Sequence, residues 1–190
     1  MKIVFATNNA HKLAEVSAVL GDGYELVTLK EVGITEDIPE TGETLDENAT
    51  IKARYVYERT GLDCFADDTG LEVEALNGAP GVRSARYATD GHDFAANNRK
   101  LLLEMRDKEN RRARFRTVIS LIRGGVEQQV EGIVNGTIAT AEAGCGGFGY
   151  DPLFIPDGHQ ITFAEMSAEA KNSISHRGRA VAALTELLKK

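Results

Sequence analysis

Acidic side chains at three positions could hold a divalent metal ion and direct a water molecule. Asp67 and Asp68 follow a short apolar run and precede Thr69-Gly70, and Glu40 lies in a polar loop. Neighbouring side chains of a strand point to opposite faces, so at most one of these aspartates can share a site with Glu40. A hard cation such as Mg²⁺ takes only one or two carboxylates when phosphates and water complete its coordination. The same Asp-Asp-Thr-Gly segment is also typical of a simple turn.

The opening of the chain predicts a site for a phosphate group. Residues 3–6 form an apolar run typical of a buried strand, and a helical spacing of apolar residues follows a short polar break. A helix start offers unpaired backbone N–H groups and the positive end of the helix dipole. Lys12 lies one turn into this helix, where its side chain can reach back over the same opening.

A polar stripe marks the helix that follows the polar loop. Thr44 and Glu47 form a capping-box pattern, in which each side chain is expected to accept a hydrogen bond from the other residue's backbone N–H. Thr44, Asn48 and Lys52 recur every four residues and share one face. Such a stripe either borders a cleft or is a solvated helix face.

Two later segments carry groups suited to a nucleotide. Four glycines surround Phe148 between positions 144 and 149, so the backbone can approach a ligand and the ring can stack on a base. The alternative is a tight loop whose phenylalanine fills the core. Lys171, His176 and Arg177 lie near the start of the last helix, where the dipole disfavours cations, so an anion or acceptor oxygen is expected beside them.

The elements that must position these residues alternate between strand and helix in the first half. A hairpin is expected further on, with Gly124-Gly125 as its turn. The alternating arginines of residues 111–116 favour a solvated strand edge. The pattern predicts a mixed sheet covered by helices. We expect strands at 2–7, 24–29, 63–67 and 71–75, a break at 67–70, helices at 10–20, 45–60, 92–106 and 176–188, hairpin strands at 114–122 and 126–134, and loops at 33–43, 77–81 and 144–156.

Length and composition favour one domain spanning residues 1–190. A net charge of −7, from 22 basic and 29 acidic residues, argues against a nucleic-acid partner. Neither a membrane span nor a signal sequence is evident, so a cytoplasmic location without a membrane partner is the expectation. Cys64 and Cys145 have no metal-ligand spacing and are interpreted as two separate thiols.

Taken in order, these segments resemble the inosine/xanthosine triphosphate pyrophosphatase family over nearly the whole chain. Small departures are Asn8, where the family often has glycine, and Thr69, where bacterial members usually have serine. The shared motifs are Thr7-x-Asn9-x-x-Lys12, Pro39-Glu-Thr-Gly-x-Thr44, Glu47-Asn48-Ala49 with Lys52-Ala53-Arg54, Ala66-Asp-Asp-Thr-Gly-Leu71, Gly78-Ala-Pro-Gly81, Ser84-Ala-Arg86-Tyr87, Gly146-Gly-Phe-Gly-Tyr-Asp-Pro152 and Lys171-x-x-Ile-Ser-His-Arg-Gly178.

The resemblance implies a two-lobed α/β chain with a long mixed sheet flanked by helices, an active-site cleft between the lobes, and a homodimer. It implies Mg²⁺-dependent cleavage of deaminated purine nucleoside triphosphates (ITP, dITP, XTP) to the monophosphate and pyrophosphate, removing them from the nucleotide pool. The N–H donors of His176 and Arg177 would suit the 6-keto oxygen of a deaminated purine. Guanine has the same 6-keto group, so these donors alone would not exclude GTP.

The resemblance also assigns roles to individual residues. Glu40 and Asp68 would bind the metal, Asp68 would accept the proton, and Thr69 would contact substrate. Those that would hold the phosphates are Thr7, Asn8, Asn9, Ala10, His11, Lys12, Lys52 and Lys171, and those that would frame and read the base and sugar are Phe148, Gly149, Tyr150, Asp151, His176 and Arg177.

Two other functions remain open at this point. The same chemistry could act on modified pyrimidine triphosphates, although the cations at positions 171, 176 and 177 argue against that interpretation. A nucleotide sensor without turnover would not need Glu40 and Asp68. Pyrophosphate release separates an enzyme from a sensor, and a panel of substrates separates the two enzymes.

Overall fold

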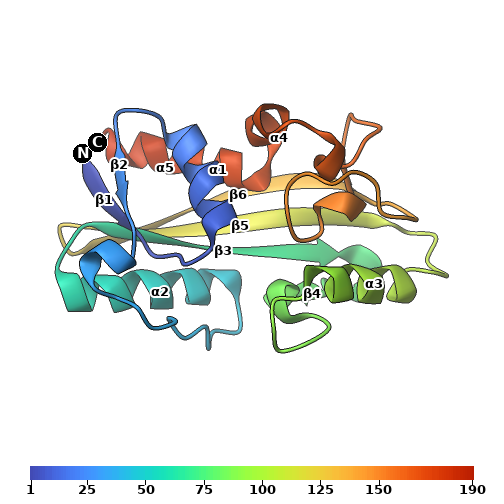
Figure 1. The fold of residues 1–190 in the computed structure, drawn as a ribbon, viewed down its shortest axis with the longest axis horizontal. Coiled ribbons are helices and arrows are strands. Elements are labelled where there is room, and N and C mark those ends of the chain that lie inside the picture. The colour runs from blue at the N-terminus through green and yellow to red at the C-terminus, as the bar shows by residue number, and fades with distance from the viewer. The chain divides into compact units, whose positions relative to one another are not determined.

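A mixed β-sheet with helices packed on it forms the chain, and the computed structural model describes residues 1–190 (Figure 1). The strand order is β2-β1-β3-β5-β6-β7, with β4 paired to β3. β1 pairs in parallel with β2 and β3, whereas β3–β4 and β6–β7 are antiparallel, which confirms the predicted mixed sheet. The strands are β1 (Lys2–Phe5), β2 (Glu25–Val27), β3 (Cys64–Val73), β4 (Pro80–Gly81), β5 (Arg112–Arg123), β6 (Val126–Ile138) and β7 (Phe154–Pro156).

Five α-helices and five short 3₁₀ turns complete the chain, and none of the helices is long and apolar enough to cross a membrane. The α-helices are α1 (Ala10–Leu20), α2 (Leu45–Thr60), α3 (Phe94–Glu104), α4 (Ala168–Ile174) and α5 (His176–Leu188). The 3₁₀ turns are η1 (Lys30–Val32), η2 (Glu74–Leu76), η3 (Ser84–Arg86), η4 (Asp151–Leu153) and η5 (Phe163–Glu165).

The chain divides into two compact units, and β3, β5 and β6 each contribute residues to both. We call them unit 1 (Met1–Asp68, Thr117–Gly132 and His176–Lys190) and unit 2 (Thr69–Arg116 and Ile133–Ser175).

In unit 1 the sheet is covered on both faces. Ile3 and Phe5 of β1 pack with residues of α1 and α5 in one buried cluster, whereas Val4 and Ala6 pack with residues of α2 in another. Alternate residues of a strand point to opposite faces, so burial on both sides explains the unbroken apolar run at residues 3–6. β1, which precedes α1 in the chain, is therefore packed on both of its faces.

Unit 2 has a core rich in aromatic side chains. Leu101 and Met105, from α3 and the turn after it, pack with Phe115, Phe154 and Phe163. The ring centroids of Phe115 and Phe154 lie 4.7 Å apart, and those of Phe154 and Phe163 lie 5.2 Å apart. This core supports the loop at 144–150, since Tyr150 belongs to the same cluster.

Three expectations about the elements were wrong, and one helix was not foreseen. Residues 67–70 form no break, because β3 continues through them. β5 lies between β3 and β6 and is not an edge strand, so its arginines do not guard an edge. The segment 144–156 ends in η4 and β7 rather than in loop alone, and α4 was not foreseen. The Gly124-Gly125 turn is confirmed, with φ values of +55° and +81° that suit a tight hairpin.

Candidate active site

The two adjacent aspartates of β3 belong to different groups of ion pairs in unit 1. Asp67 accepts hydrogen bonds from Lys12 Nζ at 3.1 Å and from Arg177 Nε at 3.4 Å, and Arg177 also bonds Glu15. Burial alone would raise the pKa of Asp67, but the charges of Lys12 and Arg177 hold this pKa well below its usual range. Asp67 is therefore a charged, fully paired carboxylate.

Asp68 has a different environment. Lys52 Nζ donates to Glu40 Oε1 at 2.8 Å and lies 3.5 Å from Asp68 Oδ1, so one ammonium group bridges two carboxylates. Asp68 Oδ2 is buried and has no hydrogen-bond partner. Burial raises the pKa of Asp68, and the positive charges of Lys52 and Lys12 only partly oppose that shift. An unpaired buried carboxylate oxygen is costly unless a ligand supplies its partner.

The chemistry of this pair fits a hard divalent cation. No group of three or more histidine, cysteine, aspartate or glutamate side chains gathers as a metal site in the structure. Mg²⁺ does not need such a cage, because it keeps water and takes one or two carboxylates together with substrate phosphates. Asp68 Oδ2 and the partly exposed Glu40 are oxygen donors of that kind.

The polar stripe of α2 builds this site. Thr44 Oγ1 accepts from Glu47 N at 3.1 Å and caps the helix, whereas Glu47 Oε2 accepts from Glu43 N, so the reciprocal bond of the predicted box is shifted by one residue. Asn48 Oδ1 accepts from Gly42 N at 2.7 Å and thereby fixes the loop that carries Glu40. Because Asn48 and Lys52 are buried, the stripe is not a solvated face.

The start of α1 differs from the expected set of open N–H groups. Asn9 Oδ1 caps the helix and accepts hydrogen bonds from His11 N at 3.0 Å and Lys12 N at 3.2 Å. Asn9 N in turn donates to Thr7 Oγ1 at 3.1 Å. Asparagine is among the best N-cap residues, so the side chain satisfies donors that the sequence left unassigned. Asn8 and His11 are exposed beside this cap.

In unit 2 the glycine loop is held by one buried ion pair. Asp151 Oδ2 accepts from Lys171 Nζ at 2.6 Å and from Phe148 N at 3.1 Å. Lys171 Nζ also lies 5.1 Å from the centre of the half-buried Phe148 ring. A side chain at Gly147, where φ is +66°, would collide with Asp151 Oδ2, so this loop position requires glycine. The backbone at Phe148 is thus held by Asp151, with the ring beside Lys171 Nζ.

A second contact fixes the same loop from α3. Asn98 is buried, and its Nδ2 donates to Gly149 O at 3.0 Å, whereas its Oδ1 has no hydrogen-bond partner. The hydroxyl of Tyr150 donates to Ser84 O at 2.6 Å. Burial raises the pKa of Tyr150 above its ordinary value, so this hydroxyl keeps its proton and acts as a donor at neutral pH.

Comparison with known sequences decides the family. Residues 3–187 match the sequence profile of the Ham1 family. The chain belongs to the Ham1 family. A dITP/XTP pyrophosphatase of Porphyromonas gingivalis is 55% identical over 188 residues, which cover 98% of this chain and 97% of that protein. Another from Christiangramia forsetii is 50% identical over 190 residues and the full length of both chains.

Solved structures of the Ham1 family have the same fold. A HAM1 protein from Coxiella burnetii superposes with a TM-score of 0.91 at 40% identity, covering 100% of this chain and 98% of that one. The Ham1 protein of Staphylococcus aureus gives a TM-score of 0.90 at 38% identity, with the same coverage. The resemblance and the fold class that the motifs predicted are confirmed.

Each unit brings together a subset of the residues that the Ham1 resemblance singled out. Unit 1 links Lys52 with Glu40 and Asp68, and unit 2 links Lys171 with Asp151 beside Phe148. Lys171 and Arg177 pair with different carboxylates and belong to different units. His176 is buried at the first position of α5, and Thr69 is half-buried in β3.

Sequence reasoning missed two residues that hold this Ham1 site, Glu15 and Asn98. Glu15 pairs with the buried Arg177, and Asn98 fixes the loop that carries Gly149. Asp67 and Asn48 were singled out, but their bonds to Arg177 and to the loop that carries Glu40 were not foreseen. Glu15 lies one turn after Lys12, on the same face of α1, and this spacing was the available signal. Nothing local in the sequence distinguishes Asn98 from its neighbour Asn97.

Proposed function

We propose that this chain hydrolyses deaminated purine nucleoside triphosphates, namely ITP, dITP and XTP, to the nucleoside monophosphate and pyrophosphate. The observation that carries the proposal is the buried, unpartnered Asp68 Oδ2 beside the Lys52–Glu40 ion pair. The names of relatives about half identical over their full length support it, since both are called dITP/XTP pyrophosphatase.

In unit 1, we assign the metal and the attacking water to the Asp68 group. Glu40 and Asp68 would hold Mg²⁺, which would neutralise charge on the phosphate oxygens and on the leaving pyrophosphate. Asp68 orients a water molecule toward the α-phosphorus and accepts its proton. A new bond forms between the water oxygen and the α-phosphorus, while the bond from the α-phosphorus to the oxygen that bridges it to the β-phosphorus breaks. Lys12 and Lys52 stabilise the charge on the departing pyrophosphate, and residues Thr7–His11 hold it.

In unit 2, we assign the base and sugar to the segment Phe148–Asp151, and we assign to Lys171 the stabilisation of phosphate charge. The half-buried Phe148 ring offers a stacking surface, for which about 1–3 kcal/mol per base is typical. In unit 1, His176 and Arg177 would read the base edge. Their N–H donors suit a 6-keto oxygen and oppose the 6-amino group of adenine.

The test is pyrophosphate release from ITP, XTP, GTP, ATP and UTP at equal concentration, with Mg²⁺ and with a chelator. We expect fast release from ITP and XTP that the chelator abolishes. Equal release from all five would remove the specificity, and preference for UTP would indicate a pyrimidine enzyme. Binding of ITP without release from any substrate would indicate a sensor. We also propose that the chain forms a homodimer. Sedimentation equilibrium of the same sample tests this, and the mass of a single chain would contradict it.

A further inference from the structure

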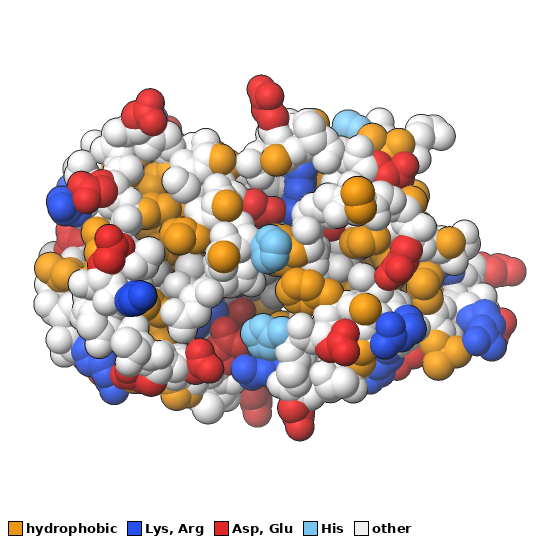
Figure 2. Space-filling model, viewed as in Figure 1, with side chains coloured by type: hydrophobic (Ala, Val, Ile, Leu, Met, Phe, Trp, Pro, Cys, Tyr) orange, Lys and Arg blue, Asp and Glu red, His pale blue; other side chains and the backbone are white.

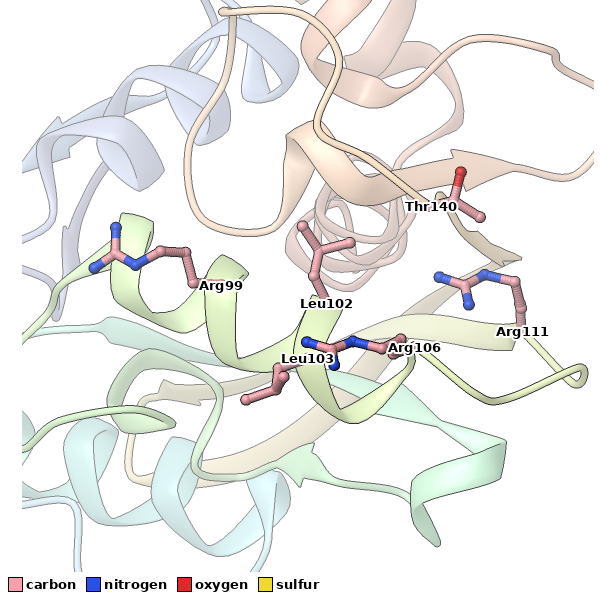
Figure 3. Close-up of a pocket in the computed structure, with 6 residues that line it drawn as sticks. All are labelled: Arg99, Leu102, Leu103, Arg106, Arg111 and Thr140. Carbon is pink, nitrogen blue, oxygen red and sulfur yellow. The ribbon is translucent and has the colours of Figure 1, made fainter.

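A cavity in unit 2 carries three arginines that the proposed reaction does not use. Its volume is about 520 Å³, within the range of about 300–1,000 Å³ typical of small-molecule sites. Figure 3 shows its lining, which comes from α3, the turn that follows it, the residue just before β5 and the segment after β6. The lining residues are Arg99, Leu102, Leu103, Arg106, Arg111 and Thr140.

Helical geometry explains why α3 and its following turn contribute four of the six. Arg99, Leu102, Leu103 and Arg106 follow the spacing i, i+3, i+4, i+7, which places them along one face. In an ordinary amphipathic helix such a stripe is apolar and buried. Here Arg99 and Arg106 are exposed and Leu103 keeps 60% of its surface exposed, so the stripe lines the cavity, and only Leu102 also packs against the core. Figure 2 shows basic side chains gathered over α3 among hydrophobic ones.

Arg111 is held in place and still has donors to offer. Its Nε donates to Ile138 O at 2.7 Å, its Nη1 to Met105 O at 2.9 Å and its Nη2 to Ala139 O at 2.8 Å. A guanidinium group has five N–H donors, so two remain beyond these three bonds. All three acceptors are neutral carbonyls, so the positive charge of Arg111 has no carboxylate partner.

The other two arginines have no protein partner. The guanidinium groups of Arg99 and Arg106 form no hydrogen bond or ion pair in the structure, although the chain has 29 acidic residues. No acidic side chain lines the cavity, and Glu104 of α3 is bonded instead to Tyr87 and Lys100. Arg112 and Arg114 of β5, by contrast, each pair with a carboxylate. Three arginines without a carboxylate partner therefore line one hollow of an acidic protein.

We propose that this cavity binds a phosphoryl anion, either inorganic phosphate or pyrophosphate or the phosphate group of a mononucleotide. Guanidinium groups match phosphate oxygens in charge and in the geometry of their paired donors. Arg111 supplies a fixed donor group, Arg99 and Arg106 add charge from the helix, and the Thr140 hydroxyl adds one neutral donor. The leucine wall would favour an anion that also carries a flat apolar group.

The experiment is a titration of the full-length protein, followed by the Nε–Hε NMR signals of the arginines and the backbone amide of Thr140. The probes are inorganic phosphate, pyrophosphate and inosine monophosphate, each without Mg²⁺ and at low and high salt. We expect saturable shifts at Arg106, Arg111 and Thr140 that weaken at high salt, because ions screen exposed charges. Tighter binding of the mononucleotide than of phosphate would place its base on the leucines. Tighter binding of pyrophosphate would identify the free anion as the ligand.

The variant Arg99→Gln/Arg106→Gln tests the assignment. We expect its dissociation constant at the cavity to rise at least about tenfold, in line with the loss of charge-assisted hydrogen bonds. Its control is Lys30→Gln/Lys190→Gln, which removes the same charge from exposed lysines of unit 1 and should leave binding at the cavity unchanged.

Three results would overturn the proposal. They are the absence of cavity shifts with all three probes, unchanged binding in the arginine variant, and equal weakening in the lysine control. A change in sedimentation of the arginine variant without any anion binding would make the arginines part of a contact between copies instead. The cavity signals are separate from pyrophosphate release, so failure of the proposed reaction would not affect them.

Discussion

At the scale of single residues, two identical side chains that are neighbours in sequence have different tasks. Asp67 accepts from two buried cations, whereas Asp68 keeps one oxygen without a partner. The difference follows from the alternation of a strand, which sends one carboxylate toward Lys12 and Arg177 and the other toward Lys52. Asp67 thus stabilises the fold, whereas the next residue, Asp68, is available for the chemistry.

Replacing each aspartate by asparagine should show this separation. Asp68→Asn keeps the fold and loses most of the turnover, because it removes the charge that would hold the metal and orient water. Asp67→Asn leaves Lys12 and Arg177 buried with a neutral partner, and breaking such pairs typically costs about 3–5 kcal/mol. The measurements are pyrophosphate release and thermal unfolding of each variant. Near-full activity of Asp68→Asn would remove this residue from the mechanism.

The two cysteines should differ in reactivity for a physical reason. Burial raises the pKa of Cys64 to about 12, whereas Cys145 is exposed. Only the thiolate is nucleophilic, so iodoacetamide at about pH 8 should alkylate Cys145 and leave Cys64 unmodified in the folded protein. Mass spectrometry of the digested protein measures this, with Cys145→Ser as the control. Rapid labelling of Cys64 would mean that β3 opens readily.

At the scale of elements, the sequence predicted those with a clear period. The apolar run of β1, the cap of α2 and the Gly124-Gly125 turn were each signalled by local rules and are confirmed. The unbroken course of β3 could not be predicted, because Asp-Asp-Thr-Gly is a good turn sequence. Only partners distant in sequence, such as Arg177, allow Asp67 to be buried inside a strand.

The candidate site, like the elements, was predictable only where the signal was local in the sequence. The types and order of its residues were enough to indicate metal and phosphate chemistry. The supporting contacts could not be predicted, since Asn98 with Gly149 and Asp67 with Arg177 join positions 51 and 110 residues apart. α4 was missed because, with seven residues, it is too short to show a helical period.

The contact between β6 and α5 depends on a glycine. A Cβ at Gly132 would collide with His176 O and Ala180 N, which are backbone atoms and cannot rotate aside as the end of a flexible side chain could. Gly132→Ala should lower the free energy of unfolding by about 1–3 kcal/mol through overpacking. Gly23→Ala is the matched control, because nothing lies within 4 Å of its added Cβ. Denaturant unfolding of both variants gives the comparison, and equal stability would mean that α5 can shift.

At the scale of the whole molecule, the last helix, α5, packs in the same buried cluster as the first strand, β1. Ala180, Val181 and Leu184 of α5 are fully buried in one cluster with Ile3 and Phe5 of β1. A chain that ends at Ser175 should therefore lose cooperative unfolding, because it exposes the apolar face of β1 to water. A chain lacking only the exposed Lys189 and Lys190 should unfold like the full-length protein. Calorimetry distinguishes the two, and a cooperative transition in the shorter chain would show that α5 is dispensable.

The polypeptide passes between the two units four times, after Asp68, Arg116, Gly132 and Ser175. No single cut in the gene can therefore yield either unit as one continuous product. Recombination could not have assembled this architecture by joining two independent coding segments end to end. During synthesis on the ribosome, unit 1 must also wait for its last segment, His176–Lys190, before its fold is complete.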